Sequence, residues 1–175
     1  KTHLLRYHSY QVARLRNTRD SGIAVVSKLK FLAIFLRATA LDAARFEATS
    51  EVGGKWQQLF GVYLELRLVE GLMDALCDIK ATSLKNEFDD AGFITSISDT
   101  VIDRTVAACR TIEEFRTWLI DERRRIDDAV NNAAFSGTLE LRVPFSIGSL
   151  CLPVKKAISK WNQAFTEIPL IYLLD

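Results

Sequence analysis

Two pairs of aspartates have the spacing that most directly suggests chemistry. Asp74 and Asp78 are four residues apart, and so are Asp99 and Asp103. On a helix this spacing brings both carboxylates of a pair to one face, and facing pairs of this kind can hold Mg²⁺ together with a diphosphate. However, Asp74 and Asp78 fall on the side of their helix away from its apolar seam, which is typical of a solvated charged face. We predict no metal and no cofactor here, and a magnesium-dependent enzyme is the third of three hypotheses.

Other catalytic patterns are weak or missing. His3 and His8 are five residues apart, which is not the spacing of metal ligands on one helix face. The segment Gly53-Gly54-Lys55 lacks the upstream glycine of a phosphate-binding loop. The sequence therefore indicates no catalytic residue, and we predict that the chain is not an enzyme.

The cysteines point to a reducing environment. They are odd in number and widely spaced, at Cys77, Cys109 and Cys151. A disulfide framework would need an even set at closer spacings, so buried free thiols are the simpler interpretation. We predict an intracellular, cytoplasmic protein, and no apolar run is long enough for a transmembrane segment.

The charge is unevenly spread along the chain, although its net value is only +1. Residues 1–40 carry eight Lys or Arg and one acidic residue, whereas residues 41–100 carry five basic and eleven acidic residues. The first hypothesis is that the basic segment lies on the acidic one, in this molecule or in a neighbouring copy. The alternatives are an anionic membrane surface, or a nucleic acid whose phosphates the segment would neutralise. The residues predicted for nucleic-acid binding are Arg6, Arg14, Arg16, Arg19, Lys28 and Lys30.

Helical periodicity governs most of the chain. Residues 55–80 carry an apolar seam with steps of three and four, which predicts a central helix. Its members are Leu59, Val62, Leu66, Val69, Met73 and Leu76. A capping box at Thr111 and Glu114 predicts a helix over 112–134. Apolar residues at steps of three and four also predict one long helix over 22–49.

Two further segments suggest surfaces that need a partner. Residues 138–147 alternate apolar and polar side chains, with Pro144 among them, which predicts an extended edge strand. The end of the chain, 168–175, is too apolar for a solvated tail, so we expect it to pack on this domain or on a partner. The residues predicted for protein interaction are Leu139, Leu141, Val143, Phe145, Leu170, Ile171 and Tyr172.

Length and composition fit one globular domain over residues 1–175, which we expect to be a piece of a longer chain. Apolar residues make up 49% of the 175 residues and charged residues 26%, as in ordinary folded proteins. We predict an all-α fold of about six helices, bundle-like, with one short extended segment near 138–147. The first hypothesis for function is a helical scaffold or protein–protein interaction domain of a larger assembly, with self-association or a protein partner. The alternative is a nucleoprotein-like domain that binds nucleic acid through its basic N-terminal helices.

Overall fold

A computed structural model describes residues 2–47, 55–83, 88–99, 106–136, 141, 145 and 147–175. Over these residues the fold is all-α with one short two-stranded sheet, which confirms the predicted fold class. The α-helices are α1 (Thr2–Tyr7), α2 (Tyr10–Arg16), α3 (Gly22–Leu29), α4 (Ala44–Glu47), α5 (Lys55–Ala81), α6 (Asp90–Ser98), α7 (Ile112–Ser136) and α8 (Cys151–Trp161). The strands are β1 (Leu32–Leu36) and β2 (Leu170–Leu174), and short 3-10 helices are η1 (Ala38–Leu41), η3 (Val106–Ala108) and η4 (Gln163–Phe165).

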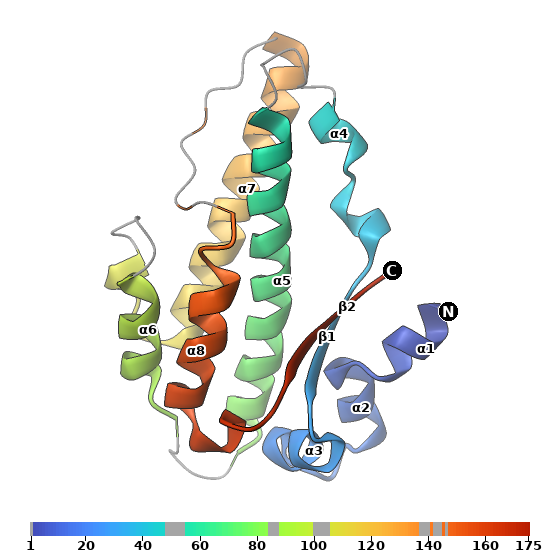
Figure 1. Cartoon of the computed structure of the whole chain (residues 1–175), viewed down its shortest axis with the longest axis vertical. Helices are drawn as coiled ribbons and strands as arrows, with labels where there is room; N and C mark the ends of the chain where they lie inside the picture. Colours follow the sequence, from blue (N-terminus) through green and yellow to red (C-terminus); the bar gives the residue numbers. More distant parts are fainter. Residues whose placement is uncertain are drawn as a thin grey trace.

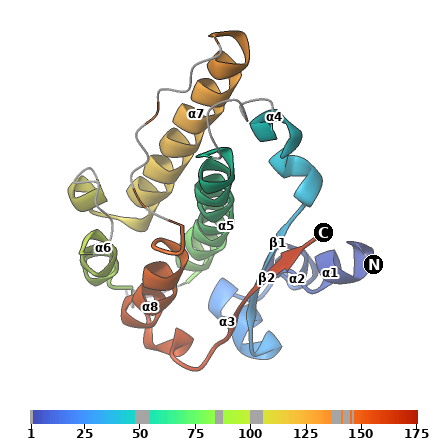
Figure 2. The same ribbon diagram turned by 45° about the horizontal axis from the view of Figure 1, so that its top comes forward.

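The long helix α5 occupies the centre of the molecule. It lies between the helices α6, α7 and α8 on one side and the strands with α1, α2 and α3 on the other (Figures 1 and 2). The six seam residues predicted from the sequence are all buried, and four of them have no exposed surface. The helix contacts α7, α8 and β1 on different sides. A helix that packs on several sides needs apolar residues around much of its circumference, and α5 has them.

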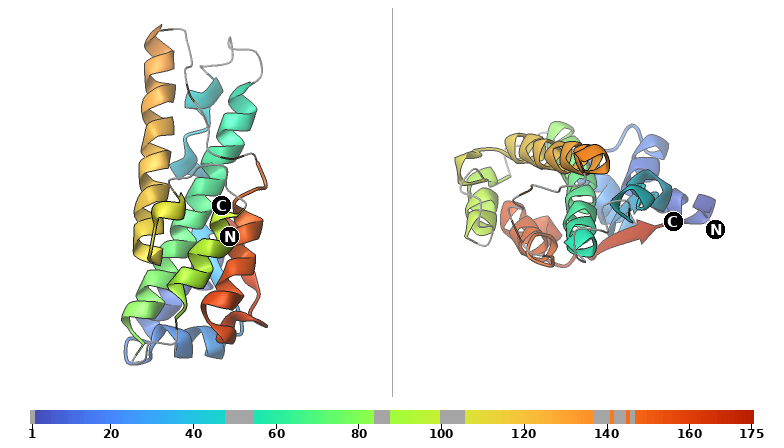
Figure 3. Two further views of the ribbon diagram at one scale, coloured as in Figure 1. Left: turned by 90° about the vertical axis from the view of Figure 1, so that its left-hand side faces the viewer. Right: turned by 90° about the horizontal axis from the view of Figure 1, so that it is seen from above.

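The helix α7 packs along α5 and begins where its capping box predicts. The backbone N–H of Glu114 donates to Oγ1 of Thr111 at 3.2 Å, and the Glu114 carboxylate accepts from the backbone N–H of Arg110. Arg123 links the two helices, because its guanidinium contacts Glu70 of α5 at 2.8 Å. Figure 3 shows α7 running beside α5 over most of its length.

The predicted helix over 22–49 is wrong, because the structure divides this segment. Helix α3 ends at Leu29, and its C-cap residue Lys30 adopts a left-handed conformation with φ of 62°. Strand β1 begins two residues later, at Leu32. Strand β1 pairs in parallel with β2, with Leu32 opposite Leu170 and Leu36 opposite Leu174. A parallel strand buried on both faces reads as a continuous apolar run, so its side chains satisfied a helical pattern equally well.

The N-terminal helices are docked on α5 by specific polar contacts. The hydroxyl of Tyr10 donates to Asp78, and Nε of Arg14 contacts the same carboxylate at 3.2 Å. The backbone N–H of Gly22 donates to Oγ1 of Thr82 at 2.9 Å, at the end of α5. This docking partly confirms that the basic segment lies against the acidic one.

The predicted strand at 138–147 lies mostly outside the described residues. None of the helices in the described part of the chain is both long and apolar enough to cross a membrane.

Candidate functional site

The carboxyl end of the two-stranded sheet brings together residues from opposite ends of the chain. Because β1 and β2 are parallel and in register, Arg37 and Asp175 follow their strands at the same edge. Asp175 is fixed there by its backbone: its N–H donates to the carbonyl of Leu36 at 3.3 Å, and its own carbonyl accepts from the N–H of Ala38. In open parallel sheets, ligands bind outside this edge.

The start of helix α1 lies beside this edge. Helix α1 begins at Thr2 and contacts β2, and the labelled ends of the chain lie near one another in Figures 1, 2 and 3. Thr2 and Asp175 are both partly exposed. Helix α1 thus begins with a hydroxyl residue, and a carboxylate residue follows β2, near the two ends of the chain.

Oxygen ligands of this kind suit Mg²⁺. Magnesium is usually held by one or two protein oxygens, with phosphate oxygens and waters completing its coordination. Over the described ranges, no three His, Cys, Asp or Glu side chains gather as a metal site. Thr2 and Asp175 are residues of the type that could supply such protein oxygens.

This edge was missed by reasoning from the sequence alone, although a signal was present. Lys1 directly precedes Thr2 in the sequence, and a Lys-Thr pair that opens a helix is the end of the phosphate-loop pattern. The five apolar residues of 170–174 followed by Asp175 form the matching strand ending. The other candidate for a phosphate loop, Gly53-Gly54-Lys55, lies outside the described residues apart from Lys55 at the start of α5.

The predicted interaction residues are divided between the core, the sheet and the undescribed part. Phe145 is 2% exposed and belongs to the core, so it offers no surface, and Leu141 packs partly buried against that core. Leu170, Ile171 and Tyr172 form β2, so the apolar tail packs on this domain. The remaining two, Leu139 and Val143, lie outside the described residues.

The basic residues predicted for nucleic-acid binding fall into two groups. Arg14 pairs with Asp78, and Lys28 pairs with Asp20 at 2.6 Å, so both charges are partly neutralised. The other four are exposed and enter no ion pair with a described residue: Arg6, Arg16, Arg19 and Lys30. The guanidinium of Arg16 lies 4.0 Å from the centre of the Tyr7 ring.

The aspartates of each predicted pair do not share a common partner in the described structure. Asp74 contacts Arg116 of α7, whereas Asp78 binds Tyr10 and Arg14 of α2. Asp99 is exposed at the end of α6, and Asp103 lies outside the described residues. The carboxylates of Asp74 and Asp78 therefore join helices together instead of sharing a ligand.

A buried polar cluster connects α5, α8 and β2. The Glu65 carboxylate accepts from the backbone N–H groups of Gly148, Leu150 and Cys151, which cap the start of α8. Burial and the adjacent Glu65 carboxylate raise the pKa of the Cys151 thiol to about 12. Burial also raises the pKa of Tyr172, whose hydroxyl has no hydrogen-bond partner in the described structure. A thiol held protonated is a poor nucleophile, so this cluster is structural.

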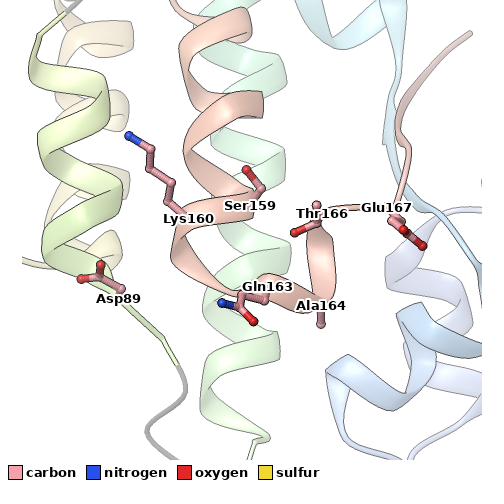
Figure 4. A pocket seen from close by; sticks show the side chains of 7 residues that line it. All are labelled: Asp89, Ser159, Lys160, Gln163, Ala164, Thr166 and Glu167. Atoms are coloured by element: carbon pink, nitrogen blue, oxygen red, sulfur yellow. The ribbon is translucent and has the colours of Figure 1, made fainter.

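Two depressions adjoin each other at the opposite, amino end of the strands. One is an open polar hollow of 780 Å³ between the start of α6 and the end of α8, into which Lys160 and Gln163 project (Figure 4). The other is a smaller, mostly apolar groove of 310 Å³ between α8 and the first residues of both strands. Ser159 and Thr166 line both.

Comparison with known proteins gave one match. No curated protein and no solved structure matches the chain. A sequence model of the family described as ORC-CDC6-like matches residues 1–175. Because this match spans the whole sequence, the chain belongs to the ORC-CDC6-like family.

Proposed function

We propose that this chain is a nucleotide-binding component of a larger assembly, and that it binds a nucleoside triphosphate with Mg²⁺ at the carboxyl end of its sheet. As a member of the ORC-CDC6-like family the chain is a helical domain of a larger assembly. The family's name points to initiator proteins of the AAA+ class, which are nucleotide-dependent. The nucleotide site and its residues are the finer part of the proposal.

The observation that carries the proposal is the meeting of α1 and β2. In phosphate-loop proteins, the Lys of the loop contacts the β- and γ-phosphates, while its Ser or Thr and a strand-end Asp hold the Mg²⁺. By sequence position Lys1 takes the first role, and Thr2 and Asp175 take the other two. The contact of α1 with β2 and the neighbouring ends of the chain in Figure 1 support a shared edge for Thr2 and Asp175.

The helices from α5 to α8 supply the scaffold part of the function. They are inserted between β1 and β2, and they form the larger part of the core. We propose that they present surfaces to protein partners, while the sheet edge responds to nucleotide. A nucleotide-dependent assembly domain with three free thiols suits the reducing interior of a cell.

Titration of the full-length protein with a fluorescent ATP analogue, with and without Mg²⁺, tests the nucleotide site. Lys1→Ala and Asp175→Asn should each weaken binding about tenfold to a hundredfold, since each removes a charged contact worth about 1.5–3 kcal/mol. The Asp175 substitution leaves the backbone hydrogen bonds in place, so thermal unfolding should not change. Asp128→Asn, at an exposed position of α7, is the matched control.

Several outcomes would overturn the nucleotide proposal. Absence of Mg²⁺-dependent binding would do so, and so would equal affinities for the wild type and both variants. The same samples test the prediction that the chain catalyses no reaction by itself, because release of inorganic phosphate from ATP is measured directly. Sedimentation of these samples with and without nucleotide tests whether the domain self-associates.

Nucleic-acid binding is a second candidate function, favoured by the exposed and unpaired cations of the N-terminal helices. Each cation that neutralises a phosphate adds about one unit to the slope of log affinity against log salt. Replacing Arg6 and Arg19 by Gln should therefore reduce this slope by about two, whereas Arg124→Gln on α7 should leave it unchanged. A protein that binds no single-stranded or duplex DNA at low salt would exclude this function.

A further inference from the structure

The apolar groove between α8 and the strands has a buried floor and a charged rim. Its floor is made by the buried side chains Leu32, Ile158 and Phe165. Leu152 stands at its border and is 62% exposed, an unusual exposure for a leucine beside a core. At 310 Å³ the groove is at the small end of the range for ligand pockets, about 300 to 1,000 Å³. A space of this size suits one bulky apolar side chain.

The rim of the groove is basic. Lys155 and Lys156 line it, and with Leu152 they share one face of α8, since the three positions are three and four residues apart. Both lysines are exposed, and neither forms an ion pair with a described residue. Along α8 this face therefore combines an exposed leucine with two free positive charges.

None of the described residues that line the groove is acidic. Asp89 and Glu167 line the adjoining polar hollow instead (Figure 4). In that view Glu167 lies beyond Thr166 on the side of the strands. Ser159 and Thr166 line both the hollow and the groove. A ligand with negative charge is thus favoured at the lysine rim of the groove.

We propose that this groove binds an acidic segment of a partner protein, which inserts one bulky apolar side chain against Leu32, Ile158 and Phe165 and places its carboxylates beside Lys155 and Lys156. The positive charges of Lys155 and Lys156 favour a partner segment with negative charge. The apolar floor favours a segment that inserts one apolar side chain, as in other interfaces where a central residue fills a pocket. The groove lies at the amino end of β1 and β2. It is therefore separate from the proposed nucleotide edge at their carboxyl end and does not depend on it.

The test uses fluorescence anisotropy with a short labelled peptide that carries one Phe flanked by Asp and Glu. The full-length protein should bind it, and the same peptide with Ala in place of Phe should bind at least about tenfold more weakly. The double variant Lys155→Glu and Lys156→Glu should lose at least about tenfold in affinity. Leu152→Asp should weaken binding similarly without unfolding the protein, because Leu152 is already exposed. Arg124→Glu, on the exposed surface of α7, is the control for a general loss of positive charge.

Three outcomes would contradict the proposed binding of an acidic partner segment in this groove. Equal binding of the Phe and Ala peptides would show that no anchor enters the groove. Equal loss in the Arg124 control would show attraction by overall charge alone. Preferential binding of a single-stranded oligonucleotide or of anionic phospholipid vesicles, lost in the double lysine variant, would overturn the protein partner. Nucleotide binding of the double lysine variant should equal that of the wild type, which separates failure at the groove from failure at the sheet edge.

Discussion

Replacing Glu65 by Ala should destabilise the protein by removing the cap of helix α8. The Glu65 side chain comes from the middle of α5 and is 7% exposed. Its oxygens accept from the backbone N–H of Leu150 at 3.1 Å and of Cys151 at 3.2 Å, and from that of Gly148. No side chain within α8 supplies a cap of its own, because the N-cap position is Leu150. The start of α8 therefore depends on a residue from another helix.

The expected loss follows from the burial of each donor. An unsatisfied buried N–H costs about 1–3 kcal/mol. The contact with Leu150 is buried, whereas those with Gly148 and Cys151 are only partly buried, so water can replace the carboxylate there. Assigning about 2 kcal/mol to Leu150 and about 1 kcal/mol to each of the others gives about 4 kcal/mol for Glu65→Ala. Glu65→Gln keeps the volume and one acceptor oxygen, so it should cost about 1–2 kcal/mol.

Urea denaturation followed by circular dichroism measures both free energies of unfolding. Hydrogen exchange at the amides of Leu150 and Cys151 should accelerate before exchange in α5 does, since α8 loses its cap first. Glu167→Ala, at an exposed position, is the control. A Glu65→Ala variant within about 0.5 kcal/mol of the wild type, or one no less stable than Glu65→Gln, would refute this account of the cap.

Three other predictions concern packing, a thiol and an ion pair. Gly22→Ala should destabilise the fold by about 1–3 kcal/mol in thermal unfolding, because the new Cβ would lie 2.7 Å from the Cα of Ile79; a stability equal to the wild type would contradict the close packing. Burial raises the pKa of Cys77 from 9.0 to about 11, so at pH 8 mass spectrometry should show iodoacetamide reacting about a hundredfold more slowly than with a free thiol. This thiol favours the folded state below pH 9 and loses that contribution as pH rises through 11, so stability that stays constant over this window would count against it. Arg123→Ala leaves Glu70, 13% exposed, without its partner from α7, and should cost about 1–3 kcal/mol in urea denaturation; a smaller effect than that of Arg124→Ala would show that the pair is not stabilising.

The helical framework could be read from the sequence because its signals are local. The seam of α5 repeats over the whole helix, and the capping box at Thr111 fixes the start of α7 within a few residues. In each case neighbouring residues contain the information, so no knowledge of distant contacts is needed. The sequence predicts buried thiols, whereas Cys77, Cys109 and Cys151 are half-buried.

The sheet and its edge depended on contacts between distant residues. Leu32–Leu36 could form either a helix or a strand by its own pattern, and pairing with Leu170–Leu174 decides for the strand. The burial of Phe145, predicted as an interaction surface, likewise follows from the helices that enclose it.

The sequence by itself determined the long helices α5 and α7 and the uneven charge, because each follows from residues close together in the chain. Only the tertiary structure decided that Arg37 and Asp175 follow their strands at one edge, since parallel strands align their ends whatever length of chain separates them. The tertiary structure also decided that α1 packs against β2. It also decided the groove beside α8, whose floor combines side chains from β1, α8 and η4.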